Sequence, residues 1–223
     1  MRNIFFLSIP FIFLCSMTPG KPCNKSASLP KHASLPKTAL LAYIGSIKGP
    51  TANFTVGVHV IMDSTIGLRY DIVFEVGQKV LSHIAFFYKF SNPYQMVYYN
   101  FLNHKTDVIK GGGSGKDPNL VVVGTEKIDS FSCTHLYEGN KHESQNYWMS
   151  TAVPGFYQMA IKLNNIDPGL ELMAINQTIF NWGGLVRVKT TSIDNGQTTT
   201  LELNLAEANT HLVFQPSDFE VPH

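Results

Sequence analysis

The side chains around Cys133 are the only local group in this sequence with the types that bind a transition metal. His135 stands two residues further on, and His142 and Glu143 follow. Cys133 and His135 share one face of any extended strand, because side chains alternate along a strand with a period of two. A structural zinc site needs a fourth ligand and closer pairing at both ends, and the sequence offers neither. We therefore expect a buried cysteine and two surface histidines, with no metal and no cofactor.

Motifs for enzymatic chemistry are absent from the sequence. It contains neither the His-Glu-x-x-His pattern of a zinc protease nor the Gly-x-Ser-x-Gly turn of a serine hydrolase. The carboxylates are scattered, so no pair stands out for acid–base chemistry. Cys133 would need a positioned histidine and a lowered thiol pKa to act as a nucleophile. We predict no catalytic residue and a protein that is not an enzyme.

A glycine-rich stretch at residues 110–118 invites comparison with a phosphate-binding loop. That loop needs a glycine five positions before its Gly-Lys pair and a serine or threonine after the pair. This chain has Lys110 and Asp117 at those positions. We therefore predict a mobile loop that joins two halves of a sheet.

Length and composition exclude several classes of protein. The 223 residues suit one domain. Seventeen Lys and Arg against sixteen Asp and Glu give a formal net charge of +1, so we expect no nucleic-acid partner. Charged residues are only 15% and aromatic residues 12%, which excludes a disordered chain and supplies a core. Three cysteines are too few for a disulfide scaffold.

The first twenty residues have the pattern of a secretory signal peptide. Arg2 precedes an apolar run at residues 4–14, and small residues follow as far as Gly20. The run is shorter than the roughly 20 residues of a membrane-spanning helix. Cys15 stands directly behind the run, where bacterial lipoproteins are acylated, so lipidation at Cys15 and cleavage after Gly20 both stay open. We predict export to the periplasm or outer membrane, or otherwise secretion.

Residues 21–38 follow as a predicted linker, before a single domain at residues 39–223. The linker is rich in Pro, Ser and Lys, and it repeats Ala-Ser-Leu-Pro-Lys at residues 27–31 and 33–37. Such a composition buries too little apolar surface to fold, so a flexible tether is expected.

The domain is dominated by alternating apolar and polar residues, the pattern of half-buried strands. Residues 54–62 and 68–76 alternate in this way, with a turn between them, so the strands follow one another as an antiparallel meander. An Asp-Asn-Gly turn at residues 194–196 predicts a later hairpin. Further strands are expected at residues 79–90, 96–101, 120–123, 132–137, 146–150, 185–191 and 199–205.

The period changes to that of a helix between residues 155 and 180. Residues 157–164 and 168–180 carry apolar groups at helical spacing, with Asp167 as N-cap and Pro168 at the first helical position. We predict a short helical insertion here. The C-terminal residues 214–222 contain too many prolines for a helix.

Two of the predicted strands, at residues 84–88 and 96–101, carry large apolar side chains on both faces. Either both faces are covered by protein, or one face lines an apolar cavity. Methionine suits a deformable lining of such a cavity. The candidate wall residues are Phe86, Tyr88, Met96, Tyr98, Trp148, Met159 and Met173.

Three segments resemble motifs of DUF4412, a family of secreted bacterial proteins. Residues 122–133 are similar to the family's G-x-x-x-I-x-G-Y-x-C pattern, although Ser130 and Phe131 replace the usual Gly-aromatic pair. Residues 147–150 resemble its Trp-containing strand, and residues 183–205 its hairpin. This resemblance extends to the periplasmic lipoprotein-carrier (LolA/LolB-like) fold. It implies a mainly β fold with short helices (α+β), in which a strongly curved antiparallel sheet or half-barrel is closed by short helices around an apolar space.

The leading hypothesis is a non-enzymatic protein of the bacterial cell envelope that binds a lipid or another apolar ligand. Its contact with a membrane would be through an N-terminal lipid alone. Two alternatives stay open: a secreted surface-interaction module with a filled core, and a secreted hydrolase. The resemblance implies no catalytic residue.

Overall fold

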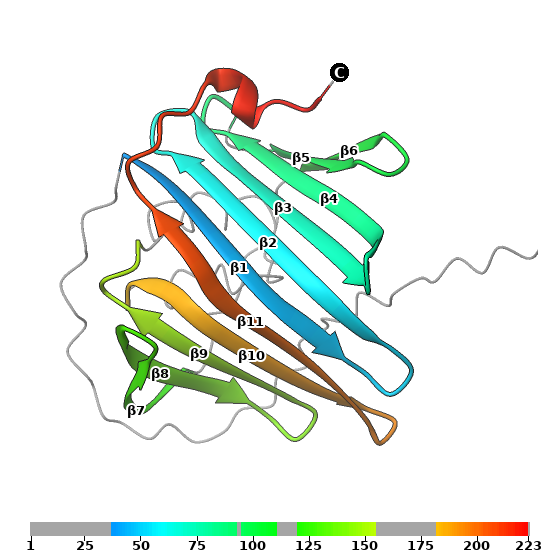
Figure 1. Ribbon diagram of the computed structural model, residues 1–223, viewed down its shortest axis with the longest axis vertical. Coiled ribbons are helices and arrows are strands. Elements are labelled where there is room, and N and C mark those ends of the chain that lie inside the picture. Colours follow the sequence, from blue (N-terminus) through cyan, green and yellow to red (C-terminus); the bar gives the residue numbers. More distant parts are fainter. Residues whose placement is uncertain (1–36, 93–94, 111–119, 155–181, 223) are drawn as a thin grey trace, which may run out of the picture.

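The computed structural model describes residues 37–92, 95–110, 120–154 and 182–222, which form one antiparallel sheet of eleven strands (Figure 1). A short 3-10 helix, η2, follows near the C-terminus. The predicted signal peptide and helices lie outside the described residues, as do nearly all of the linker and of the glycine-rich loop. Thr38, predicted as the last residue of the linker, instead begins β1 and is buried, and Lys110 ends β6. The elements are β1 Thr38–Lys48, β2 Asn53–Asp63, β3 Gly67–Val76, β4 Lys79–Lys89, β5 Gln95–Asn100, β6 Lys105–Lys110, β7 Val121–Ile128, β8 Phe131–Gly139, β9 Glu143–Ser150, β10 Gly184–Asp194, β11 Gln197–Asn209 and η2 Pro216–Phe219.

The sheet consists of two meanders joined in its middle. Strands β1 to β6 form one meander and β7 to β11 the other, and β1 pairs with β11 between them. Figure 1 shows β1 in blue beside β11 in orange, within a curved sheet that does not close. The prediction of a mainly β, curved antiparallel sheet is therefore confirmed.

The hairpin predicted at residues 194–196 is present between β10 and β11. Asn195 and Gly196 connect β10 to β11 with φ angles of 49° and 75°. Such two-residue turns need positive φ at both central positions, because their twist then matches that of the flanking strands.

Strands β1 and β6 were not among the predicted strands. β1 carries buried residues at consecutive positions, including Leu41, Ala42 and Tyr43, which obscures the alternation. Its Gly45 permits the close pairing with β11, since a Cβ atom there would lie 1.8 Å from the carbonyl oxygen of Glu202. β6 is short and partly charged, as is common for the edge of a sheet.

The pairing register gives the sheet two distinct faces. On the core face Val58 of β2 lies opposite Ile72 of β3, which lies opposite Ile84 of β4. On the outer face, the next position along each strand brings together His59, Asp71 and Ala85. The large apolar cluster of the molecule contains the core-face residues of strands β1 to β5 and β8 to β11.

The C-terminal segment packs against the outer face of β4 and β5. There Ala85, Phe87 and Tyr99 form a second apolar cluster, and Val221 packs against it. Nζ of Lys89 lies 2.7 Å from a carboxylate oxygen of Glu220. The segment contains one helical turn, η2, contrary to the expectation from its prolines. The turn is possible because Pro216 occupies its start, where a missing N–H costs nothing.

The turn between β2 and β3 is stabilised by the Asp63 carboxylate, whose Oδ1 accepts hydrogen bonds from three donors. These are Thr65 N at 2.7 Å, Thr65 Oγ1 at 2.6 Å and Ile66 N at 3.2 Å. Burial alone would raise the pKa of Asp63, but these hydrogen bonds and the charge of Lys37 outweigh burial and lower it.

Asp63→Asn tests this turn, because asparagine keeps an acceptor oxygen but carries no charge. A lowered folded-state pKa gives stability that is present above the unfolded pKa of about 4 and is lost as the pH falls through the folded value. We expect the variant to lose about 1 kcal/mol of unfolding free energy at pH 7 and less at pH 3, as measured by urea titration. An equal loss at both pH values would contradict this.

Candidate functional site

The core face carries a row of aromatic rings across three neighbouring strands. Tyr70 of β3 lies opposite Phe86 of β4, and Phe86 lies opposite Tyr98 of β5. The ring centroids of Tyr70 and Phe86 are 6.1 Å apart, and those of Phe86 and Tyr98 are 5.6 Å apart. We call these three residues the aromatic row. Tilted and edge-on contacts of this kind add to the stability that apolar burial provides.

Four of the predicted wall residues belong to this part of the core face. Phe86 and Tyr98 are members of the aromatic row, and Tyr88 follows on β4, two residues beyond Phe86. Met96 lies two residues before Tyr98 on β5, opposite Ile109. Phe86, Tyr88 and Met96 are buried and Tyr98 is partly buried. The structure thus brings these four side chains together, whereas Met159 and Met173 lie outside the described residues.

Trp148, the remaining predicted wall residue, belongs to the outer face. Its neighbour Tyr147 lies opposite Val188 on the core face, so Trp148 points the other way. The indole stacks on His135 with centroids 4.5 Å apart, and Cζ of Arg187 lies 5.1 Å from its ring. Although its register places Trp148 on the outer face, the residue is buried and belongs to the same large apolar cluster as Phe86.

Three buried tyrosines on the core face differ in how their hydroxyls are satisfied. The Tyr43 hydroxyl donates a hydrogen bond of 3.1 Å to the backbone oxygen of Leu185. The hydroxyls of Tyr70 and Tyr88 have no hydrogen-bond partner among the residues that the structure describes. Tyr70 is 5% exposed and Tyr88 0%, so bulk solvent does not compensate. An unpaired buried hydroxyl costs about 1–3 kcal/mol.

Burial also keeps these tyrosines in their neutral form. It raises the pKa of Tyr43, Tyr70 and Tyr88, and proximity to Tyr43 raises that of Tyr70 further. A neutral phenol can donate one hydrogen bond and also accept. Tyr70 and Tyr88 were not recognised as a polar pair in the sequence, where Tyr70 is an apolar position of an alternating strand and Tyr88 is a candidate wall residue.

The buried positions of the core face offer no charge to an anion. Within the described ranges the only buried ionisable carboxylates are Asp63, in the β2–β3 turn, and Asp71, on the outer face, and no Lys, Arg or His is buried. These buried positions carry apolar side chains and neutral tyrosine hydroxyls. Ligand sites for apolar molecules have this composition, in which a few polar groups fix orientation.

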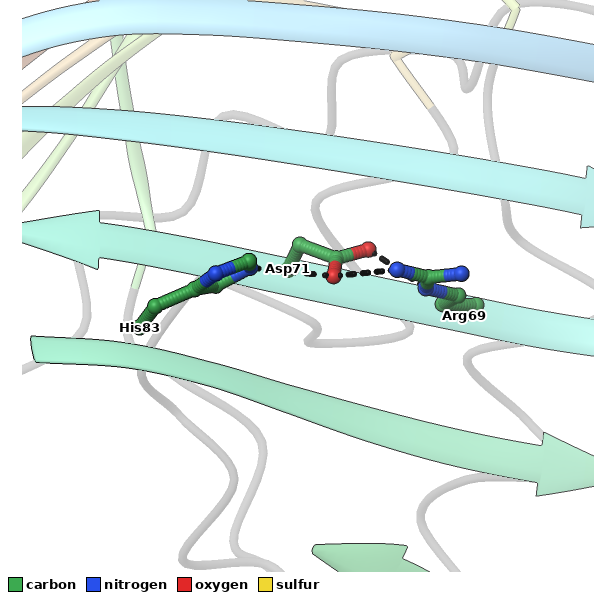
Figure 2. Close-up of polar contacts among 3 residues, drawn as sticks. All are labelled: Arg69, Asp71 and His83. Atoms are coloured by element: carbon green, nitrogen blue, oxygen red, sulfur yellow. Dashed lines mark hydrogen bonds and ion pairs between the residues drawn. The ribbon is translucent and has the colours of Figure 1, made fainter. Parts of the chain in front are cut away.

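The outer face carries a polar cluster around Asp71, shown in Figure 2. Arg69 donates two hydrogen bonds of 2.8 Å to the Asp71 carboxylate, from Nε and from one terminal nitrogen. His83 Nε2 lies 3.5 Å from the same carboxylate, and its ring stacks on Phe101 at 4.0 Å. The Arg69 guanidinium lies over the Phe87 ring, 5.2 Å from its centroid. The cluster thus neutralises a buried carboxylate.

An aspartate beside a histidine could also orient an imidazole for proton transfer. A hydrolase would need a nucleophile within hydrogen-bond reach of that ring. In the described part of the chain no serine, threonine or cysteine side chain hydrogen-bonds to the His83 ring. The other contacts of the cluster are with aromatic rings of the outer face, where Arg69 lies over Phe87 and His83 stacks on Phe101.

His135 and Cys133, two of the candidate metal ligands, have other partners in the structure. His135 contacts Glu126 at 3.2 Å and Asn146 at 3.0 Å, and it stacks on Trp148. Cys133 is buried, and burial raises its thiol pKa. Among the described residues, no three His, Cys, Asp or Glu side chains are grouped to hold a metal ion. Nor does this part of the chain include a helix long and apolar enough to cross a membrane.

Comparison with known proteins finds similarity to solved structures but none in sequence. No family model matches the chain, and no curated protein matches it in sequence. Solved structures that resemble it include a DUF1329 family protein from Desulfovibrio piger, with a TM-score of 0.38, 9% identity, and coverage of 84% of this chain and 91% of that one. The resemblance to DUF4412 stays a prediction.

Two further solved structures are similar to a comparable degree. An uncharacterised conserved protein from Thermus thermophilus has a TM-score of 0.45 and 8% identity, covering 81% of this chain and 85% of that one. A domain from Vibrio parahaemolyticus, assigned to outer membrane lipoprotein sorting, has a TM-score of 0.36 and 10% identity, covering 82% and 88%. Such values describe a backbone path and carry nothing about ligands.

The contrast between Tyr43 and Tyr70 predicts opposite effects of the same substitution. Tyr70→Phe removes a hydroxyl without a partner, so the unfolding free energy should stay level or rise by up to about 1 kcal/mol. Tyr43→Phe removes the hydrogen bond to the Leu185 carbonyl and should lower the unfolding free energy by about 1 kcal/mol. Urea titration of both variants measures this. Equal destabilisation would show that both hydroxyls are satisfied in the folded protein.

Proposed function

We propose that this chain is a non-enzymatic protein of the bacterial cell envelope that binds a lipid or another apolar ligand on its core face. The observation that carries the proposal is the aromatic row, which lies on a face without charge at its buried positions. Two buried hydroxyls without partners belong to this face, one on Tyr70 within the row and one on Tyr88. A site for an apolar molecule needs a broad surface of this kind and few polar groups. The location in the envelope rests on the signal peptide predicted at residues 1–20.

Apolar burial can supply enough energy for such binding. Each methylene removed from water contributes about 0.8 kcal/mol, so ten methylenes of an acyl chain contribute about 8 kcal/mol. That sum corresponds to a dissociation constant near 1 μM, before the costs of ordering the ligand and the side chains. The rings of the aromatic row and the thioether of Met96 provide contacts that adapt to a flexible chain.

The two faces of the sheet differ in which described elements pack against them. The outer face of β4 and β5 is packed by the C-terminal segment through Val221. None of the strands that the structure describes forms a second layer over the core face, since all of them belong to the one sheet. The outer face of β4 and β5 is therefore the poorer candidate for a ligand.

A surface-interaction module with a filled core is the second candidate. The observation that favours it is the near-complete burial of Phe86 and Tyr88, at 6% and 0% exposed. In that case the aromatic row serves packing alone, and the protein binds no apolar probe. Direct binding measurements separate the two candidates.

Two adjacent phenylalanines on β4 make a matched test, because they have the same side chain and point to opposite faces. Phe86 lies in the aromatic row, while Phe87 lies in the outer cluster with Ala85 and Tyr99. We expect wild-type protein to bind the neutral dye N-phenyl-1-naphthylamine with a dissociation constant of roughly 1–10 μM. Phe86→Leu should weaken this binding about fivefold or more, and Phe87→Leu should leave it unchanged.

Fluorescence titration measures these affinities, and thermal unfolding by circular dichroism confirms that both variants are folded. A wild-type protein that does not bind the dye would support the filled-core module. Equal weakening by the two variants would mean that the dye does not distinguish the faces, and the assignment of the ligand to the core face would be wrong.

A further inference from the structure

We infer that the ligand is a neutral acyl ester, and that the hydroxyls of Tyr70 and Tyr88 bind its ester carbonyl. This inference rests on the proposed function, because it names the chemistry of the molecule held on the core face. It selects among three classes of apolar ligand: a hydrocarbon, a free fatty acid and an ester.

The two tyrosines lie on the same face of neighbouring strands. Tyr70 lies opposite Phe86, and Tyr88 lies opposite Leu68, so the tyrosines are diagonal neighbours on β3 and β4 and share the core face. Diagonal positions in an antiparallel pair are about 7–8 Å apart, which is within reach of two tyrosine side chains. A carbonyl oxygen has two lone pairs and can accept from both.

The comparison with Tyr43 shows what the two hydroxyls lack. Tyr43 is equally buried, at 2% exposed, and donates to the Leu185 carbonyl. Tyr70 and Tyr88 are donors of the same kind, at 5% and 0% exposed, without a carbonyl among the described residues. A carbonyl group of the ligand would therefore accept the hydrogen bonds that these two hydroxyls do not make within the described protein. A hydrocarbon would leave both hydroxyls unpaired.

The charge of the site separates an ester from a free fatty acid. A buried carboxylate needs a cation or several strong donors. In the ranges that the structure describes, no Lys, Arg or His is buried. Because burial raises the pKa of Tyr70 and Tyr88, both remain neutral donors at physiological pH. Two neutral donors suit the uncharged carbonyl of an ester.

Three probes with one fluorophore and one chain length test the inference on the full-length mature protein. They are pyrene-dodecanoic acid, its methyl ester and dodecylpyrene, titrated at pH 7.5. We expect the ester to bind about tenfold more tightly than either other probe, because the hydrocarbon accepts no hydrogen bond and the carboxylate of the acid would be buried without a cation.

The double variant Tyr70→Phe/Tyr88→Phe keeps both rings and removes both hydroxyls. It should bind the ester and the hydrocarbon with equal affinity, and its affinity for the hydrocarbon should not fall. Tyr43→Phe is the matched control, because its hydroxyl already has a partner. This control should keep the tenfold preference for the ester.

The outcomes separate this inference from the proposed function. Equal binding of ester and hydrocarbon by the wild-type protein, or a preference for the acid, would overturn the inference and leave the apolar site intact. Binding of no probe would overturn the proposed function itself. If the double variant does not fold, the infrared stretch of a carbon-13-labelled ester carbonyl decides on wild-type protein. A shift to lower frequency than in hexane is expected, and an unshifted band would refute the hydrogen bonds.

Discussion

The antiparallel pairing of β1 with β11 is the interaction on which the rest of the structure depends. It joins the meander of β1 to β6 to the meander of β7 to β11, and without it the sheet would be two separate halves. Leu41 is paired with Ala208 and Lys48 with Thr200, so the contact links the beginning of the described chain to its end. Closing such a long loop costs entropy, which the many hydrogen bonds and apolar contacts of the completed sheet must offset.

The same pairing determines which side chains meet on each face. A shift of one residue in register would move every side chain of a strand to the other face. In the observed register the core face is uncharged at its buried positions, and the Asp71 carboxylate faces outward, where Arg69 binds it with two hydrogen bonds. A buried carboxylate without that partner would be strongly destabilising. The separation of charge from apolar surface therefore follows from register, and it makes the core face suitable for an apolar ligand.

Much of this fold could be predicted from local patterns. The strand around Val58 alternates strictly, and the Asn195-Gly196 turn has conformational requirements that few other residues meet. β1 could not be predicted in the same way, because its position in the middle of the sheet buries residues at consecutive positions. Its pairing with β11 is a long-range contact that leaves no local signal.

The candidate site was predictable in part for the same reason. Phe86 and Tyr98 were predictable as apolar residues of strands, whereas the register that pairs them directly places them on a common face. Trp148 has apolar neighbours on both sides, so alternation could not show that it faces outward beside His135. The unpaired hydroxyls of Tyr70 and Tyr88 depend on the surroundings of each ring in the folded protein. A sequence pattern records only that these positions are aromatic.

The most direct test of this account is native mass spectrometry of the protein purified from its own cell envelope without detergent exchange. The account predicts a second species, heavier than the polypeptide by the mass of a lipid, that disappears on denaturation while the lipid is recovered in the organic extract. A single species with the mass of the polypeptide alone, unchanged after incubation with envelope lipids, would contradict the claim that the core face binds an apolar ligand.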